Sequence, residues 1–185
     1  MSAERVALGP DAVEAAVRRM AAEILARAET AGARPGELAI VGVRRGGVHL
    51  AERLRSLIGQ ASGSPPPLGT LDIALYRDDL AERGSAPVVG PTDIRFPVQG
   101  RTIVLVDDVL YTGRTIRAAL DELVDFGRPR RVWLAVLIDR GGRELPIAAD
   151  FAGARVEAGG GEDVQVRLAE GGAGEDAVVV RARKA

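Results

Sequence analysis

The sequence contains no cysteine and a single histidine, His49, among 185 residues. Without cysteine the chain has no disulfide, no thiolate nucleophile and no metal site with thiolate ligands. A single histidine cannot supply a multi-histidine zinc site, and it disfavours a Ser-His-Asp triad. We therefore expect His49 to have a structural role, and any chemistry to rest on carboxylates, arginines, hydroxyls and backbone groups.

Long apolar runs are also missing. The longest, such as residues 132–138, have the length of a strand and are too short to cross a membrane. The N-terminal segment is charged and lacks the apolar stretch of a signal peptide, so we expect a cytoplasmic protein with no membrane partner. Aromatic residues make up only 3% of the chain, so the core must be built from Val, Leu, Ile and Ala.

No charge of one sign dominates: 25 basic residues stand against 26 acidic ones, for a formal charge of −1. This balance predicts no general affinity for nucleic acid, although it is compatible with a local basic patch. A hydrophobic content of 46% is typical of globular proteins. The length fits one domain with a substantial core, and we expect a single domain over residues 1–185.

Hydrophobic patterning predicts strands that alternate with helices. Helical spacing follows Asp11, which we expect to cap the first helix, and recurs after Gly47 up to a stop at Gly59. A third helix should open at residues 112–115 and turn its apolar residues, up to Phe126, to the core. Buried strands are expected at 38–43, 103–106 and 132–138, a half-exposed strand at 71–75, and a pairing of 164–168 with 178–180.

This alternation implies an α/β domain with a mainly parallel sheet flanked by helices. Ligands of such sheets bind beyond the carboxyl ends of the strands, where residues 44–47 and 107–115 are expected to lie. Residues 77–99 form the longest irregular stretch, and a loop of this length in a compact domain is usually functional.

An acidic pair precedes a glycine-containing helix start in the segment 107–115. Asp107 and Asp108 are expected to end a strand, and Thr112, Gly113, Arg114 and Thr115 to open a helix. A helix N-terminus offers unpaired N–H groups and a positive dipole end to a phosphate. Gly113 lets the backbone come close, and the threonine hydroxyls add donors.

The two carboxylates repel phosphate and suit ribose hydroxyls or a metal-bound sugar. Together the two parts describe a site for a phosphoribosyl group. The alternative is an acidic strand end followed by a well-capped helix, which the two aspartates alone leave open. The sequence lacks the GxxxxGK[ST] motif of P-loop NTPases and has no GxGxxG after a strand.

The segment VLVDDVLYTGRT, residues 104–115, resembles the site for 5-phosphoribosyl-1-pyrophosphate (PRPP) in type I phosphoribosyltransferases. LDIALYRDDL, ALDELVDFGRPRR and LAVLIDRGGRELPIAADFAG resemble the family of bifunctional pyrimidine-operon regulators and uracil phosphoribosyltransferases, over most of the chain. The resemblance implies a type I phosphoribosyltransferase fold with a small hood and a flexible lid loop. It implies a homodimer or higher oligomer that makes UMP from uracil and PRPP, with Mg²⁺ bound with PRPP. Many members of this family also bind the leader of pyrimidine-biosynthesis messenger RNA when UMP is present.

The resemblance assigns roles by position. The aspartates Asp107 and Asp108 would hold the ribose hydroxyls, and the phosphate loop would hold the 5′-phosphate with Thr112, Gly113, Arg114 and Thr115. The pyrophosphate loop would consist of Arg44, Arg45, Gly46 and Gly47. Here the family more often has Thr-Arg-Gly in place of the last three residues. We still expect pyrophosphate binding, because the version in this chain resembles that of purine phosphoribosyltransferases.

The lid and the base site follow from the same resemblance. The lid, residues 77–99, would bring Arg77, with Tyr76 and Arg83, to the leaving pyrophosphate, and we count Arg77 with the two aspartates as catalytic. Uracil would lie against Ile138, Asp139 and Arg140 and be read mostly by backbone groups. Purine enzymes of this superfamily usually have an acidic residue at the position of Tyr111. The absence of an acidic residue here favours a pyrimidine as the base. The alternative is that Tyr111 only packs under the ribose and does not select the base.

The RNA-binding face of the family is only partly present. Arg18, Arg19 and Arg143 are kept, and Glu157 adds a repulsive charge. Small residues replace a cation or potential cation elsewhere, at Ala22, Gly142, Ala148 and Ala154. Each lost cation removes a phosphate contact, so we expect weak RNA binding at most. The alternatives to an enzyme are an RNA-binding attenuator that senses nucleotides and a non-catalytic PRPP sensor. The sensor leaves LYRDDL and DRGGRELPI unexplained.

Overall fold

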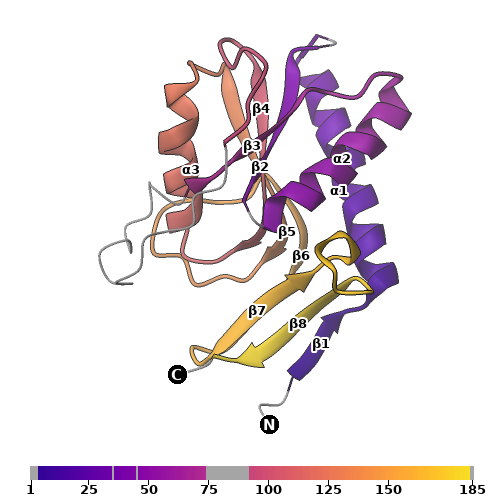
Figure 1. The fold of residues 1–185 in the computed structure, drawn as a ribbon, viewed down its shortest axis with the longest axis vertical. Coiled ribbons are helices and arrows are strands. Elements are labelled where there is room, and N and C mark those ends of the chain that lie inside the picture. Colours follow the sequence, from indigo (N-terminus) through magenta and orange to yellow (C-terminus); the bar gives the residue numbers. More distant parts are fainter. Residues whose placement is uncertain (1–3, 35, 45, 74–91, 184–185) are drawn as a thin grey trace.

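The computed structural model describes residues 4–34, 36–44, 46–73 and 92–183, and these form two sheets and three long helices (Figure 1). The larger sheet is parallel, in the order β3-β2-β4-β5-β6. Its strands are β2 (Leu38–Val43), β3 (Leu68–Leu71), β4 (Thr102–Leu110), β5 (Arg131–Asp139) and β6 (Phe151–Arg155). The helices are α1 (Pro10–Thr30), α2 (Gly46–Ser62) and α3 (Arg114–Asp125).

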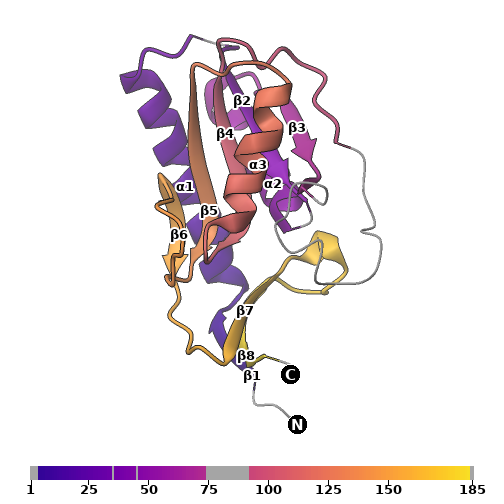
Figure 2. The same cartoon turned by 90° about the vertical axis from the view of Figure 1, so that its left-hand side faces the viewer.

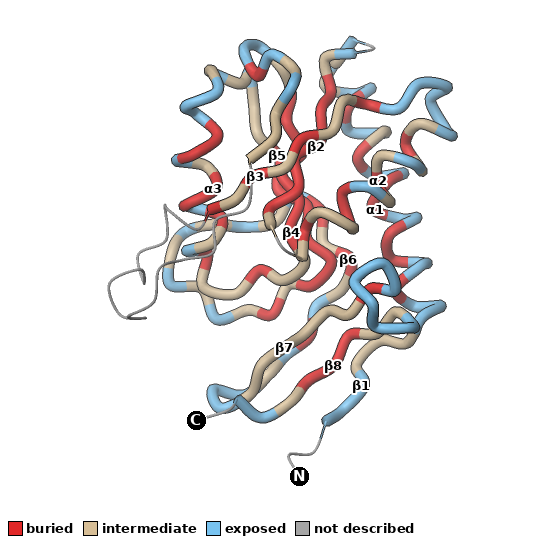
Figure 3. The backbone as a smooth tube through the Cα atoms, in the orientation of Figure 1, coloured by how far each residue is buried: buried red, intermediate tan, exposed pale blue. Residues whose placement is uncertain are grey.

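Helices cover both faces of the parallel sheet. Helices α1 and α2 pack on one face and α3 on the other, as Figures 1 and 2 show. Successive side chains of a strand point to opposite faces, so Val104 joins the core under α1 and α2 while Leu105 joins the core under α3. The central strands are therefore buried on both sides (Figure 3), which explains their continuous apolar runs.

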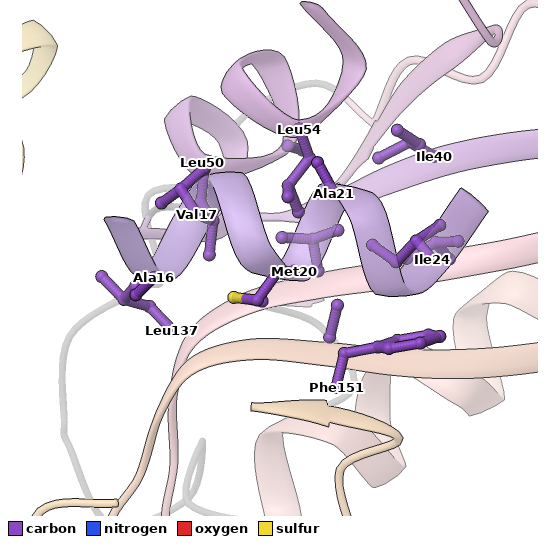
Figure 4. Packing of buried hydrophobic residues seen from close by; sticks show 14 of the residues in the cluster. Ala16, Val17, Met20, Ala21, Ile24, Ile40, Leu50, Leu54, Leu137 and Phe151 are labelled. Atoms are coloured by element: carbon purple, nitrogen blue, oxygen red, sulfur yellow. The ribbon is translucent and has the colours of Figure 1, made fainter. Parts of the chain in front are cut away.

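The core under α1 and α2 is packed by aliphatic side chains around Met20 (Figure 4). Ile24 of α1 and Leu50 and Leu54 of α2 are fully buried there. On the sheet side, Leu137 and Phe151 complete the contact. At about 1.5–3 kcal/mol for each large apolar side chain, this burial holds α1 and α2 against the sheet.

The smaller sheet, which we call the hood, is antiparallel, in the order β1-β8-β7. Its strands are β1 (Glu4–Leu8), β7 (Glu162–Arg167) and β8 (Ala177–Ala182), and a 3-10 turn, η2 (Ala169–Gly171), follows β7. Strands from the two ends of the chain thus lie side by side. The hood lies next to the carboxyl ends of the parallel strands (Figure 2), because residues of β7 share a cavity with Asp108 of β4.

The expected fold class is confirmed, as are strand 38–43 and the pairing of 164–168 with 178–180. Strands β1 and β6 were not predicted. In the part of the chain that the structure describes, no helix is long and apolar enough to cross a membrane. Residues 77–91 of the expected lid lie outside the described residues, and 92–99 contain only an isolated bridge from Asp93 to Thr70.

Outside the site, four predictions about element bounds or core residues were wrong. Gly9, and not Asp11, is the N-cap of α1, with Pro10 in the first turn, where its missing N–H costs nothing. Helix α2 continues through Gly59, where a Cβ would lie 2.8 Å from Pro65, so this glycine serves close packing. Phe126 follows the end of α3 and is 42% exposed. The strand expected at 71–75 is β3, which ends at Leu71.

Candidate active site

The acidic pair lies within β4, which runs four residues past the predicted end at Val106 because Val109 and Leu110 continue the ladder with β5. Asp107 is 5% exposed and Asp108 half-buried. The Asp108 N–H donates to Asp107 Oδ1 over 2.9 Å, and the Val109 N–H donates to Asp108 Oδ1 over 2.8 Å. Burial raises the pKa of Asp108 although these groups act to lower it. A carboxylate so placed is stabilised by any further donor or cation that a ligand brings.

The start of α2 presses against β4 at the two glycines of the pyrophosphate loop. A Cβ on Gly47 would lie 3.0 Å from Asp107 Cα and closer still to the carbonyl oxygen of Val106. A Cβ on Gly46 would collide with the carboxylate of Asp108. The contact therefore requires glycine at position 47, and the bare Gly46 gives the Asp108 side chain its space. The pyrophosphate loop and the acidic pair are in direct contact.

The phosphate loop opens α3 as predicted. Gly113 is the N-cap, with φ of 92° in the left-handed region that favours glycine. The N-cap glycine offers no side chain, but Thr112 Oγ1 accepts from the N–H of Arg114 over 3.3 Å. Residues after β5 support the loop from outside: the N–H groups of Glu144 and Leu145 donate to Thr112 O over 3.0 and 3.1 Å. Thr115 is half-buried, and exposed Arg114 pairs with Glu144 over 2.8 Å.

Arg44 follows β2, and its side chain donates to Thr70 Oγ1 of β3 over 3.4 Å. Its Nε is buried and has no hydrogen-bond partner among the described residues. Arg44 therefore keeps a donor for a ligand or for a side chain at this edge of the sheet. Arg45 of the pyrophosphate loop, and Tyr76, Arg77 and Arg83 of the expected lid, lie outside the described residues.

At the base site expected at the end of β5, two backbone groups already form hydrogen bonds within the protein. Ile138 is fully buried. The backbone C=O of Asp139 accepts from Val156 N–H over 3.1 Å, and the backbone N–H of Arg140 donates to Leu110 O over 3.0 Å. These two backbone groups are thus already paired. Burial acts to raise the pKa of Asp139, but hydrogen bonds from Gly141 N–H and Arg143 outweigh it and lower that pKa.

Tyr111 and Arg140 form a stacked pair beside this strand end. The Arg140 guanidinium lies 3.7 Å from the centre of the Tyr111 ring. Arg140 is 7% exposed and also donates to the carbonyls of Gly159 and Glu162, on the way into the hood. A Cβ on Gly142 would lie 2.6 Å from the Tyr111 ring. Arg140 and Gly142 therefore hold the Tyr111 ring in place. Arg140 also joins the end of β5 to the hood, a contact that the sequence did not predict.

The three arginines expected to contact RNA differ in accessibility. The Arg18 side chain is 62% exposed and pairs with Glu14 over 2.6 Å. The Arg19 side chain is 52% exposed and donates to Gly153 O. The Arg143 side chain is only 22% exposed. Its guanidinium donates hydrogen bonds within the protein, to Asp139, Ile147 O and Tyr111 O. The geometry thus gives Arg143 a structural role in shaping the loop after β5.

A cavity of about 440 Å³ lies between the core and the hood, within the size range of small-ligand sites. On the side of the parallel sheet the cavity is lined by Gly46, His49 and Asp108. From the hood it is lined by residues 165–168 and 171–173. The position of the hood could not be predicted from the sequence. His49 lines this cavity, although we expected a structural role for it.

Comparison with known proteins agrees with this geometry. A family model described as "Phosphoribosyl transferase domain" matches residues 9–166. "Bifunctional protein PyrR" of Roseiflexus sp. (strain RS-1) is 54% identical over 177 residues, which cover 96% of this chain and 94% of that protein. The chain belongs to the PyrR family of phosphoribosyltransferases. The PyrR of Chloroflexus aurantiacus is 50% identical over 181 residues, which cover 98% of this chain and 97% of that protein.

Solved phosphoribosyltransferases share the fold of this PyrR-family chain. The hypoxanthine phosphoribosyltransferase of Trypanosoma cruzi matches with a TM-score of 0.71 and 19% identity, over 98% of both chains. The HGPRT-ase of Leishmania tarentolae, solved in complex with GMP, has a TM-score of 0.71 and 19% identity, over 100% of this chain and 99% of that one. At this identity the likeness shows the fold alone.

Proposed function

We propose that this chain is a uracil phosphoribosyltransferase, which makes UMP and pyrophosphate from uracil and PRPP. One observation carries the proposal: the acidic pair of β4 lies against the glycine start of α2 and is followed, after a short turn, by the start of α3, all at the carboxyl ends of the parallel strands. Two helix N-termini suit the two phosphate ends of PRPP, and the carboxylates between them suit its ribose. The resemblance of the loop after β5 to that of uracil phosphoribosyltransferases supports uracil as the base.

In the proposed reaction, N1 of uracil bonds to C1 of the ribose while the bond from C1 to the pyrophosphate oxygen breaks. The oxygen keeps the electron pair, and the N1 proton passes to water. Positive charge develops on the ribose ring, next to the carboxylates of Asp107 and Asp108. Preorganised charges at a developing charge are commonly the largest catalytic contribution. The N-terminus of α3 would anchor the 5′-phosphate, and the N-terminus of α2 would face the leaving group.

Mg²⁺ fits this site as part of the substrate. Among the described residues, no group of three or more His, Asp or Glu side chains could hold a metal ion. Mg²⁺ commonly keeps several waters and binds through substrate phosphates with few protein ligands. Bound to PRPP, it would neutralise charge on the leaving pyrophosphate.

Tyr111 supports a pyrimidine over a purine. It stands where purine enzymes of the superfamily carry an acidic residue, and Arg140 and Gly142 hold its ring in place. A neutral ring offers no carboxylate to accept a proton or a hydrogen bond from a purine. Because two backbone groups at the end of β5 are already paired, we propose that uracil is selected by the stacked Tyr111 and Arg140 together with the remaining backbone groups.

Regulation of pyrimidine genes through leader RNA is the second candidate function, favoured by the word "bifunctional" in the name of the relatives. Exposed Arg18 and Arg19 are compatible with it. The alternative that RNA binding is the main activity has no specific observation in its favour. A cytoplasmic location and a homo-oligomeric state stay predictions.

The test is an initial-rate assay of uracil-dependent pyrophosphate release with PRPP and MgCl₂. We expect release that depends on uracil, yields UMP in equal amount and falls at least about tenfold in Asp108→Asn. Uracil-independent release, or release without UMP, would contradict the proposal.

A further inference from the structure

One titratable side chain in the cavity under the hood is not used by the proposed reaction. His49 lines this 440 Å³ space together with Gly46 and Asp108. Its side chain is 37% exposed, so the ring is open to a ligand and not part of the core. The opposite wall is the hood, where Gly171 and Gly172 leave room for close approach to the backbone.

His49 shares a face of α2 with the pyrophosphate loop. Residues three apart on a helix are neighbours on its surface, so His49 lies one turn above Gly46. The first turn of α2 contains no acidic residue. The positive end of the α2 dipole and the imidazole therefore face the same cavity, without an acidic side chain of α2 itself to cap that end.

The charged groups that face His49 or share its cavity are two carboxylates and one arginine. On α2, Glu52 Oε2 lies 3.4 Å from Nδ1 of the ring, so Nε2 is the nitrogen left for a ligand. From β4, the cavity receives the carboxylate of Asp108, and from β7 it receives Arg167. Arg167 already forms a bidentate pair with Glu4, over 2.8 and 2.6 Å.

We propose that His49 donates a hydrogen bond from Nε2 to the leaving pyrophosphate of PRPP in this cavity. The identity of the ligand as PRPP rests on the proposed function, whereas the position of His49 in the cavity does not. His49 shares its proton without transferring it, so the pyrophosphate still leaves with the electron pair of the broken C1–O bond. With Nδ1 facing Glu52, this contact needs a proton on Nε2, so PRPP should bind more tightly at low pH than at high pH.

The histidine count makes a direct test simple. His49 is the only histidine of the chain, so its ring signals in a proton NMR spectrum need no assignment. We expect magnesium pyrophosphate to shift these signals in a saturable way and to raise the midpoint of the His49 titration. Sodium sulfate at equal ionic strength is the control. An equal shift with sulfate, or no shift while calorimetry shows pyrophosphate binding, would overturn the inference.

Two variants add a kinetic readout. His49→Gln should raise KM for PRPP about tenfold at pH 6.5 with a smaller change in kcat, since one charge-assisted hydrogen bond is lost. The difference from wild type should be smaller at pH 8.5 than at pH 6.5. Glu52→Gln is the companion variant: its amide oxygen can still accept from Nδ1, so it should change the KM for PRPP at pH 6.5 less than His49→Gln does.

The outcomes separate this inference from the proposed function. If pyrophosphate shifts the His49 signals but uracil gives no UMP, the choice of base is wrong and the contact stands. If UMP forms while His49→Gln keeps the wild-type KM at both pH values, the contact is wrong and the function stands. Thermal melts of both variants ensure that a folded protein is compared in each case.

Discussion

The contact between Gly47 and β4 gives a sharp stability prediction for Gly47→Ala. The added Cβ would lie 3.0 Å from both Asp107 Cα and the Val106 carbonyl carbon, and closer to its oxygen. These are backbone atoms of the central strand, which pairs with β2 and β5 on either side and cannot retreat. Overpacking of this kind costs about 1–3 kcal/mol, and with a backbone clash we take about 3. Alanine regains about 1 kcal/mol of helix propensity.

The net loss is therefore about 2 kcal/mol, which lowers Tm by about 4–8 °C in a chain of this size. Circular dichroism melts of the purified protein measure it. Gly160→Ala is the matched control, because a Cβ there has nothing within 4 Å and no unusual φ, and it should leave Tm unchanged. Gly46→Ala meets only the movable carboxylate of Asp108, so it should cost less stability but lower kcat/KM. A Tm of Gly47→Ala equal to that of Gly160→Ala would refute the close contact.

Three further predictions concern the acidic pair, a buried glutamate and RNA. Asp107→Asn and Asp108→Asn should each lower kcat/KM at least about tenfold with Tm within a few degrees, because a charge-assisted bond contributes about 1.5–3 kcal/mol; wild-type kinetics in both would make the pair structural. Burial raises the pKa of Glu122 above its ordinary 4.5. Stability should therefore fall as the pH rises from about 4.5 through the raised pKa, and Glu122→Gln should remove that loss in urea titrations at several pH values. Pyrimidine leader RNA should bind weakly at physiological salt in filter assays, and nanomolar UMP-dependent binding would show that other arginines rebuild the basic face.

The parts of the site that depend on neighbours in sequence could be predicted. Gly113 at a helix start and the apolar run before Asp107 are local signals, and the structure places both as expected. The extent of β4 was underestimated because two carboxylates look like a strand end. They stay in the strand because Val109 and Leu110 continue the pairing with β5.

The parts that depend on distant contacts could not be predicted. Strand β1 pairs with β8 from the other end of the chain, and no local pattern shows this partner. The cavity that His49 lines exists only because the hood is placed there. Likewise, Arg143 looks like a free surface cation in the sequence. Its role became visible only when the loop after β5 brought Leu110 and Ile147 carbonyls to its guanidinium.

The central claim, a phosphoribosyltransferase that uses uracil, is tested most directly by competition in one vessel. Uracil, hypoxanthine, guanine and orotate are mixed in equal amounts with limiting PRPP, MgCl₂ and the purified protein, and the nucleotides formed are separated and identified. We predict UMP as the main product, with little or no product from the other three bases. IMP, GMP or OMP as the main product would contradict the assignment.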